Sequence, residues 1–160
     1  MKHKILVVDD EKDICRALEF LLNGEGYSVA LAHSGEEAID KLKKEHFDVV
    51  LTDFKLGKMD GIAVLEKTKE LSSDTQVLIM TAFASIESAV EAMKKGASDY
   101  IVKPFLNEEI RLTVRRVLEQ KRLIAENIAL KQQLSQRMGC KEFFTDSDVM
   151  MNIFDTLEKV

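Results

Sequence analysis

The sequence predicts an α/β fold in which a parallel sheet is covered by helices on both faces. Five short runs are apolar on both faces of the strands they would form, and they alternate with longer segments whose apolar residues recur at helical spacing. Glycines punctuate the turns between these segments, at Gly24, Gly26, Gly35 and Gly96. Five strands in about 105 residues favour a flavodoxin-like sheet of order 2-1-3-4-5 over the larger six-stranded dinucleotide-binding fold.

The expected elements follow one another in βαβ order along the chain. Strands are expected at Ile5–Val8, Val29–Ala32, Val49–Leu51, Val77–Met80 and Tyr100–Val102. Apolar residues at helical spacing lie between them: Ile14, Leu18, Leu21 and Leu22; Ala38, Ile39 and Leu42; Ile62, Leu65 and Leu71; Ile86, Val90 and Met93.

After Pro104 the sequence predicts one long helix. Asn107 can cap its first turn, and no Gly or Pro follows until Gly139. The last helix of a domain is usually shorter than roughly 20 residues. We therefore expect residues 107–137 to extend beyond the domain and to pair with a second copy of the chain as a coiled coil. The predicted dimer stripe consists of Ile110, Val114, Val117, Ile124 and Ile128, with Lys121 interrupting it. A second, partial stripe runs through Leu123, Asn127, Leu130 and Leu134.

The charge pattern argues against a free-standing nucleic-acid binder. The net charge is −5 and the sequence pI is about 5.3. Residues 107–137 carry seven Lys/Arg against four Asp/Glu, and we interpret this local excess as a solvated helix face. Within residues 138–160, the stretch SDVMMNIFDTLEKV reads as a capped helix that is too short to form its own core, so we expect residues 138–160 to begin a further domain.

The sequence predicts a soluble, cytoplasmic protein. The apolar run after Lys4 is too short for a signal peptide, and no apolar stretch is long enough to span a bilayer. Cys15 and Cys140 lie far apart, which indicates a reducing compartment and neither a disulfide framework nor a zinc site.

Short polar groups follow four of the five expected strands. In an open parallel sheet, functional groups gather at the carboxyl ends of the strands, beside the point where the strand order reverses. The groups are Asp9 and Asp10 after the first strand, Asp53 after the third, Thr81 after the fourth and Lys103 after the fifth. Each has a structural explanation of its own, since an aspartate such as Asp10 can simply cap a helix, but together they indicate one site. The second strand ends at Ala32-His33, outside that point, and is expected to contribute nothing.

The chemistry of this set favours Mg²⁺ and phosphoryl transfer. Three carboxylates in one crevice raise each other's pKa unless a cation neutralises them, and all-oxygen ligands suit Mg²⁺. Asp53 could then attack phosphorus and form an aspartyl phosphate. The Lys103 ammonium group and the Thr81 hydroxyl could each bind an oxygen of the transferred group.

Four motifs carry a resemblance to a known family. Residues 1–119 resemble the receiver domain of two-component response regulators. The matching motifs are VVDDE, LTDF with MDG, MTA and DYIVKPF. The resemblance implies that Asp53 accepts phosphate from a sensor histidine kinase. It also implies that Asp10, Asp53 and the backbone carbonyl of Lys55 ligate Mg²⁺, with Asp9 acting through water. Thr81 and Tyr100 would form a switch pair, and the peptide between Lys103 and Pro104 would be cis. One departure is Gly57, which stands where the family commonly has proline and gives the loop more freedom.

The remainder of the chain resembles the nitrogen-regulatory-protein-C type of response regulator. In that type a linker helix joins the receiver to an AAA+ ATPase that remodels sigma-54 RNA polymerase on DNA. These residues hold no G-x-x-x-x-G-K-[ST] phosphate loop, so the chain is expected to be truncated before the ATP-binding domain.

Three other interpretations remain open at this point. The receiver could drive a different output domain. The chain could be a Mg²⁺-dependent phosphatase of the haloacid dehalogenase type, although that chemistry needs an Asp-x-Asp pair on one loop. It could also be a module that dimerises through residues 107–137 and whose acidic pocket is vestigial.

Overall fold

One parallel sheet organises the molecule. The structure is a computed structural model, and it describes residues 2–82 and 85–138. The strands are β1 (Lys4–Val8), β2 (Ser28–Ala32), β3 (Val49–Asp53), β4 (Gln76–Thr81) and β5 (Asp99–Val102). They pair in the order β2-β1-β3-β4-β5, so the predicted fold class and strand order are confirmed.

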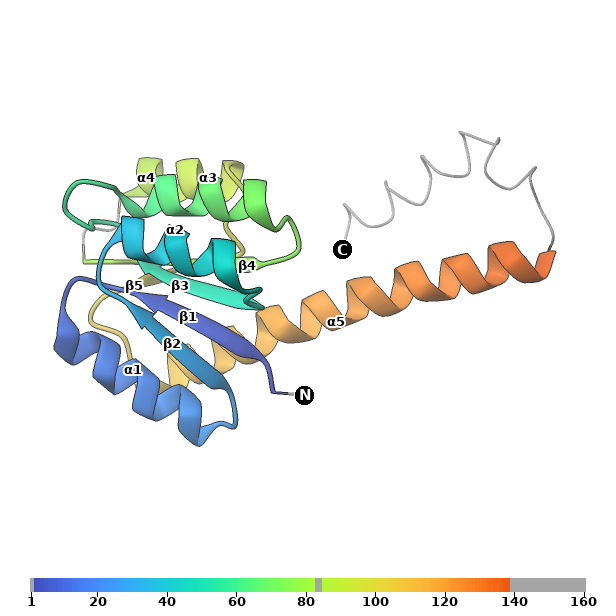
Figure 1. The fold of residues 1–160 in the computed structure, drawn as a ribbon, viewed down its shortest axis with the longest axis horizontal. Helices are drawn as coiled ribbons and strands as arrows, with labels where there is room; N and C mark the ends of the chain where they lie inside the picture. The colour runs from blue at the N-terminus through green and yellow to red at the C-terminus, as the bar shows by residue number, and fades with distance from the viewer. Residues whose placement is uncertain (1, 83–84, 139–160) are drawn as a thin grey trace. The chain divides into compact units, whose positions relative to one another are not determined.

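Helices cover both faces of this sheet. They are α1 (Lys12–Gly24), α2 (Gly35–Lys44), α3 (Gly61–Leu71), α4 (Ile86–Lys94) and α5 (Asn107–Met138). In Figure 1, α1 and the first turns of α5 lie on one face, and α2, α3 and α4 lie on the other. None of the helices among the described residues is long and apolar enough to span a membrane.

The alternation of side-chain direction along the strands divides the core into two layers. Successive side chains on a strand point to opposite faces of the sheet. Val7 and Leu51 therefore pack with α1 and α5, whereas Leu6 and Val50 pack with α2, α3 and α4. All four side chains are fully buried. Burial on both faces explains why these strands read as continuous apolar runs.

Three helices begin at side chains that satisfy free backbone N–H groups. Ser34, Asp60 and Ser85 each accept a hydrogen bond from the backbone N–H three residues further on. These caps fix the points at which α2, α3 and α4 begin, close to the carboxyl edge of the sheet.

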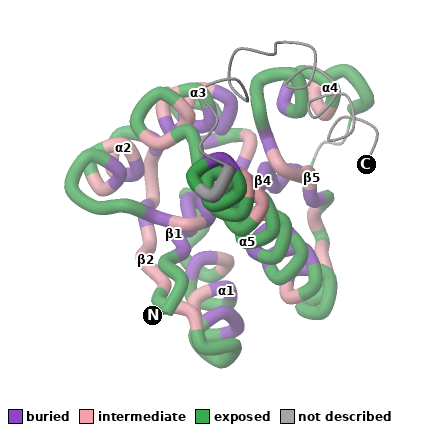
Figure 2. Tube along the Cα trace, turned by 90° about the vertical axis from the view of Figure 1, so that its right-hand side faces the viewer, coloured by how far each residue is buried: buried purple, intermediate pink, exposed green. Residues whose placement is uncertain are grey.

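The first half of α5 belongs to the core, which corrects the predicted dimer stripe. Ile110, Val114 and Val117 are each 0% exposed and pack in the layer that also contains α1. They are therefore unavailable to a second copy. Ile124 and Ile128 are 58% and 54% exposed, and this part of α5 is green in Figure 2. The helix leaves a compact unit that ends at Lys121.

Four cations of α5 have acidic partners on the α/β body, which the interpretation as a solvated face had missed. The pairs are Arg111 and Arg115 with Glu25, Arg116 with Asp99, and Lys121 with Asp48 and Asp74. Exposed pairs contribute little individually. The Lys121–Asp48 contact is the most enclosed, at 3.0 Å, with side chains that are 20% and 24% exposed. It explains why a lysine interrupts the apolar stripe.

The expected third segment, residues 138–160, lies outside the described residues except for Met138.

Gly61 offers a test of how tightly the loop after β3 is packed. A Cβ at Gly61 would lie 2.3 Å from the carbonyl oxygen of Asp53, and that oxygen belongs to backbone. We expect Gly61→Ala to lower the free energy of unfolding by about 2 kcal/mol or more, because the loop must move. Gly24→Ala is the matched control, since nothing lies within 4 Å of a Cβ there. It should change stability by less than about 1 kcal/mol. Urea unfolding measures both, and equal midpoints for the two variants would contradict this packing.

Candidate functional site

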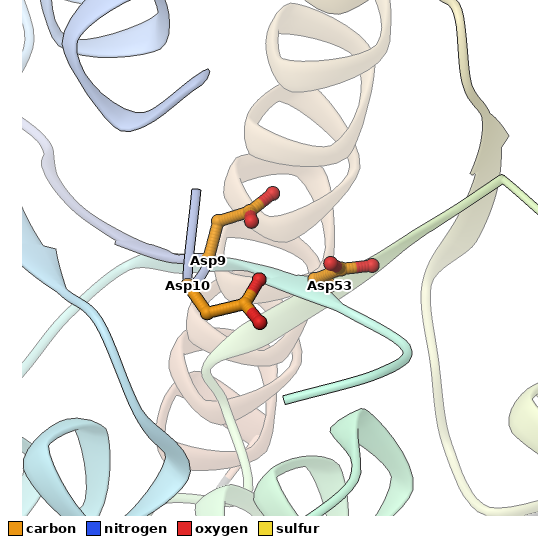
Figure 3. A group of neighbouring side chains, drawn as sticks. All are labelled: Asp9, Asp10 and Asp53. Carbon is orange, nitrogen blue, oxygen red and sulfur yellow. The ribbon is translucent and has the colours of Figure 1, made fainter. Parts of the chain in front are cut away.

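Three carboxylates meet at the carboxyl edge of the sheet. Asp9 and Asp10 directly follow β1, and Asp53 is the last residue of β3. One oxygen from each lies within 4.8 Å of the others. Figure 3 shows the three side chains as neighbours. Pairing of β1 with β3 in register, up to Val8 opposite Thr52, brings these ends together. An all-oxygen cluster of this kind fits a hard divalent cation such as Mg²⁺.

Asp9 is the most restrained of the three. It is 0% exposed. Its Oδ1 accepts a hydrogen bond from the backbone N–H of Glu11 at 2.9 Å, and its Oδ2 accepts one from Lys103 Nζ at 2.8 Å. Its own N–H donates to the Ala32 carbonyl at 3.1 Å. Both carboxylate oxygens are thus engaged by protein groups, which suits a supporting role for Asp9.

Asp10 differs from its neighbour in being exposed and uncommitted. Glu11, rather than Asp10, occupies the cap position of α1, so the simple capping explanation for Asp10 does not hold. The Asp10 carboxylate has no hydrogen bond or ion pair to any other residue that the structure describes. Its oxygens remain available to a ligand.

Asp53 lies in an electrostatically costly position. It is 8% exposed, and its Oδ2 lies 3.3 Å from Lys103 Nζ. Burial raises the pKa of Asp53 and the charge of Asp9 raises it further, while Lys103 and a hydrogen bond from the Lys55 backbone oppose these effects. Burial alone would lower the pKa of Lys103, but its hydrogen bond to Asp9 and the charges of Asp9 and Asp53 raise it above the ordinary value. Lys103 therefore stays cationic between the two carboxylates.

A small cavity opens over Asp53. It has a volume of about 210 Å³ and is lined by Asp10, Glu11, Asp53, Lys55, Thr81, Ala82 and Lys103. Thr81, at the end of β4, is 1% exposed within this lining. The structure therefore brings together the aspartates, Lys55, Thr81 and Lys103. The peptide between Lys103 and Pro104 is cis, as the resemblance implies.

Tyr100 lies outside this cavity. It is half-buried on β5, and its hydroxyl lies 3.3 Å from the hydroxyl of Ser88 on α4. Ser88 in turn lies 2.7 Å from Ser85, the residue that caps α4. The predicted partner of Thr81 thus contacts the first turn of α4 in this structure.

The loop after Asp53 depends on two glycines. Gly57 has φ of +77°, a conformation that proline cannot adopt and that other residues adopt at a cost. The loop conformation thus favours glycine at position 57. The sequence had indicated only that glycine gives this loop more freedom. Gly61 donates its N–H to the Phe54 carbonyl at 2.7 Å and closes the loop against β3.

His33 is the site residue that sequence reasoning missed. The end of β2 was expected to contribute nothing, but His33 Nδ1 lies 3.3 Å from the carbonyl oxygen of Asp9. The Sγ of Cys15 approaches the same oxygen at 3.3 Å. Burial, reinforced by the Asp9 charge, raises the pKa of this thiol to about 11. The pattern Ser34-x-x-Glu37 signals the start of a helix directly after this strand, but it does not signal the contact of the His33 ring.

Comparison with known proteins agrees with this geometry. A profile of the response regulator receiver domain matches residues 5–115. The chain belongs to this family. The receiver is similar to the transcriptional regulatory protein ZraR of Escherichia coli K12, with 47% identity over 114 residues, which cover 71% of this chain and 26% of that protein.

Two further relatives extend the comparison. The regulatory protein AtoC of Escherichia coli K12 is 36% identical over 158 residues, 99% of this chain and 34% of AtoC. The crystal structure of NtrX from Brucella abortus superposes with a TM-score of 0.77 at 32% identity, over 82% of this chain and 30% of NtrX. The chain thus spans about a quarter to a third of the length of the curated relatives it matches.

The raised pKa of Asp53 has a measurable consequence for stability. In EDTA at pH 7, Asp53→Asn should unfold at a higher temperature than wild type, because folding disfavours the charged carboxylate. The difference should shrink as the pH falls through the raised pKa of Asp53 and vanish below about 4, where the carboxyl is protonated in the unfolded chain as well. Saturating Mg²⁺ should reduce or reverse it, since the cation stabilises only the protein that binds it.

Thermal unfolding in EDTA and in Mg²⁺ measures both effects. Asp60→Asn is the control, because asparagine preserves the cap of α3 and the residue lies outside the cavity lining. A lower unfolding temperature for Asp53→Asn in EDTA would show that Lys103 outweighs burial and Asp9.

Proposed function

We propose that Asp53 accepts a phosphoryl group from a sensor histidine kinase. Receiver domains of response regulators interact with such kinases. The observation that carries the proposal is the placement of Asp53 at the base of the 210 Å³ cavity, with Lys103 at 3.3 Å and two further aspartates beside it. Among the aspartates, Asp53 combines burial with an open path to the cavity.

The chain's own residues have distinct parts in the transfer. An oxygen of Asp53 attacks phosphorus, and the bond to the kinase histidine breaks, its electron pair remaining on the histidine nitrogen. Lys103 Nζ, already next to Asp53, binds an oxygen of the arriving group and neutralises its charge. The Thr81 hydroxyl donates to a second oxygen.

Mg²⁺ is the proposed cofactor. Asp10, Asp53 and the backbone carbonyl of Lys55 would hold it, and Asp9 would act through water. When bound, it neutralises carboxylate and phosphoryl charge. The free oxygens of Asp10 and the engaged oxygens of Asp9 support this division of roles.

Thr81 and Tyr100 are the proposed switch pair. Movement of Thr81 toward phosphate would vacate space beside β5, and Tyr100 could then leave its contact with Ser88. That contact joins Tyr100 to the capped first turn of α4. A local change in charge at Asp53 would thus reach the surface of the domain.

The output is proposed from the relatives and the resemblance. The receiver, residues 1–119, and the linker helix, residues 107–137, would control an AAA+ ATPase that begins within residues 138–160. That ATPase would use ATP to activate sigma-54 RNA polymerase at DNA. The similarity to AtoC over 158 residues, well past the receiver, supports this output over an unrelated one.

Phosphorylation at Asp53 is the direct test. With acetyl phosphate and Mg²⁺, the wild type should gain one phosphoryl group by intact-mass spectrometry, and Asp53→Asn should gain none. Thr81→Ala should still be labelled, but beryllofluoride, which mimics the acyl phosphate, should no longer alter the NMR signals of Tyr100.

Two outcomes would overturn these roles. Equal labelling of Asp53→Asn and wild type would contradict the assignment of Asp53 as the phosphoacceptor. A normal beryllofluoride response in Thr81→Ala would remove Thr81 from the switch. Asp60→Asn, outside the cavity lining, should be labelled like wild type.

We further propose that the exposed part of α5 pairs with a second copy. Its apolar residues are Leu123, Ile124, Ile128, Leu130 and Leu134, each between 52% and 59% exposed. Leu123, Asn127, Leu130 and Leu134 follow alternating spacings of four and three, which suits the seam of a coiled coil. Ile124 and Ile128 would flank that seam.

Lysine substitutions test the seam. Leu123→Lys with Leu130→Lys should give monomers in light scattering, while Ile124→Lys with Ile128→Lys should weaken the dimer less. Leu112→Lys, at an exposed position of α5 before Lys121, is the control and should remain dimeric. Dimers in all three variants would place the interface elsewhere.

A further inference from the structure

The carbonyl oxygen of Asp9 is held by two side chains from different elements. His33 Nδ1 and Cys15 Sγ each lie 3.3 Å from it. A carbonyl can only accept hydrogen bonds, so His33 makes this bond in the tautomer that carries hydrogen on Nδ1. Cys15 approaches from α1 and His33 from the end of β2, which places the oxygen between them.

The position of His33 is itself set by the start of α2. Its backbone N–H donates to Glu37 Oε2 at 2.9 Å. The Glu37 N–H donates in return to Ser34 Oγ at 3.1 Å. This reciprocal arrangement is a capping box displaced by one residue, because the glutamate accepts from the residue before the cap. It restrains the backbone from which the imidazole ring reaches Asp9.

The Asp9 carbonyl belongs to the peptide that joins Asp9 to Asp10. A peptide group is planar, so fixing its oxygen also fixes the direction in which the next residue leaves. The Asp9 side chain has restraints of its own, from Glu11 and Lys103. The Asp10 carboxylate has none among the described residues, and this peptide fixes the position of the Cα from which its side chain starts.

We propose that His33 is a positioning residue for the divalent-cation site, acting through the Asp9–Asp10 peptide on the Asp10 carboxylate. The proposal rests on the proposed function, in which Asp10 is a cation ligand. His33 does not touch the cation. Groups that orient metal ligands in this way typically change metal affinity 10- to 100-fold when they are removed.

Substitutions of His33 that place a hydrogen-bond donor at the position of Nδ1, at the position of Nε2 or at neither test the proposal. In His33→Asn the amide nitrogen can occupy the place of Nδ1, whereas in His33→Gln it reaches only toward the place of Nε2. His33→Leu removes the donor altogether. Mg²⁺ affinity, followed by NMR titration of the whole chain, should fall about tenfold in His33→Leu and His33→Gln and stay within about twofold of wild type in His33→Asn.

A second measurement separates positioning from general damage. At saturating Mg²⁺, His33→Gln should be phosphorylated by acetyl phosphate at nearly the wild-type rate, because its defect lies in holding the cation. His46→Leu, at the opposite edge of the sheet, is the control histidine and should bind Mg²⁺ like wild type. The comparison of His33→Gln with His33→Asn remains informative if His33→Leu does not fold, since both replacements are polar.

The outcomes distinguish this proposal from the proposed function. Wild-type protein that shows no Mg²⁺ binding would overturn the cation site as a whole. Wild-type binding together with equal affinities in His33→Asn and His33→Gln would overturn the role of His33 alone. Loss of phosphorylation in His33→Gln that saturating Mg²⁺ does not restore would also overturn it.

Discussion

The ion pair between Lys103 and Asp9 is the contact on which the rest of the site depends. It joins the ends of β5 and β1 at 2.8 Å, across the ends of β3 and β4, and Asp9 is fully buried. A buried pair gains little net stability, because both charges lose their hydration. Its value here is geometric, since it holds an ammonium group 3.3 Å from Asp53.

Charge balance explains why this edge of the sheet suits a divalent cation. Asp9 and Asp53 share the one ammonium group of Lys103, and the Asp10 carboxylate has no ion pair with another residue that the structure describes. The raised pKa of Asp53 reflects its burial and the remaining repulsion from Asp9. The two adjacent aspartates differ in their contacts. Both carboxylate oxygens of Asp9 accept hydrogen bonds from protein groups, while the Asp10 carboxylate is available to bind a ligand.

Helix α5 combines two environments within one continuous element. Before Lys121 its buried residues Ile110, Val114 and Val117 complete the core on one face of the sheet, and four of its cations pair with acidic residues of the compact unit. Beyond Lys121 the same kind of apolar residue is exposed. The ion pair of Lys121 with Asp48 joins this helix to the residue before β3.

The sequence by itself determined the sheet, its order and the composition of the site. Parallel strands buried on both faces read as apolar runs, and their carboxyl ends must meet, so Asp9, Asp53 and Lys103 could be placed together without coordinates. Only the tertiary structure decided which part of α5 is core, because the same spacing of apolar residues serves a sheet or a second helix equally well. It also decided the contact of His33 with the Asp9 carbonyl and the conformation of Gly57, since a single side chain aimed at a distant carbonyl and one backbone angle leave no periodic trace in a sequence.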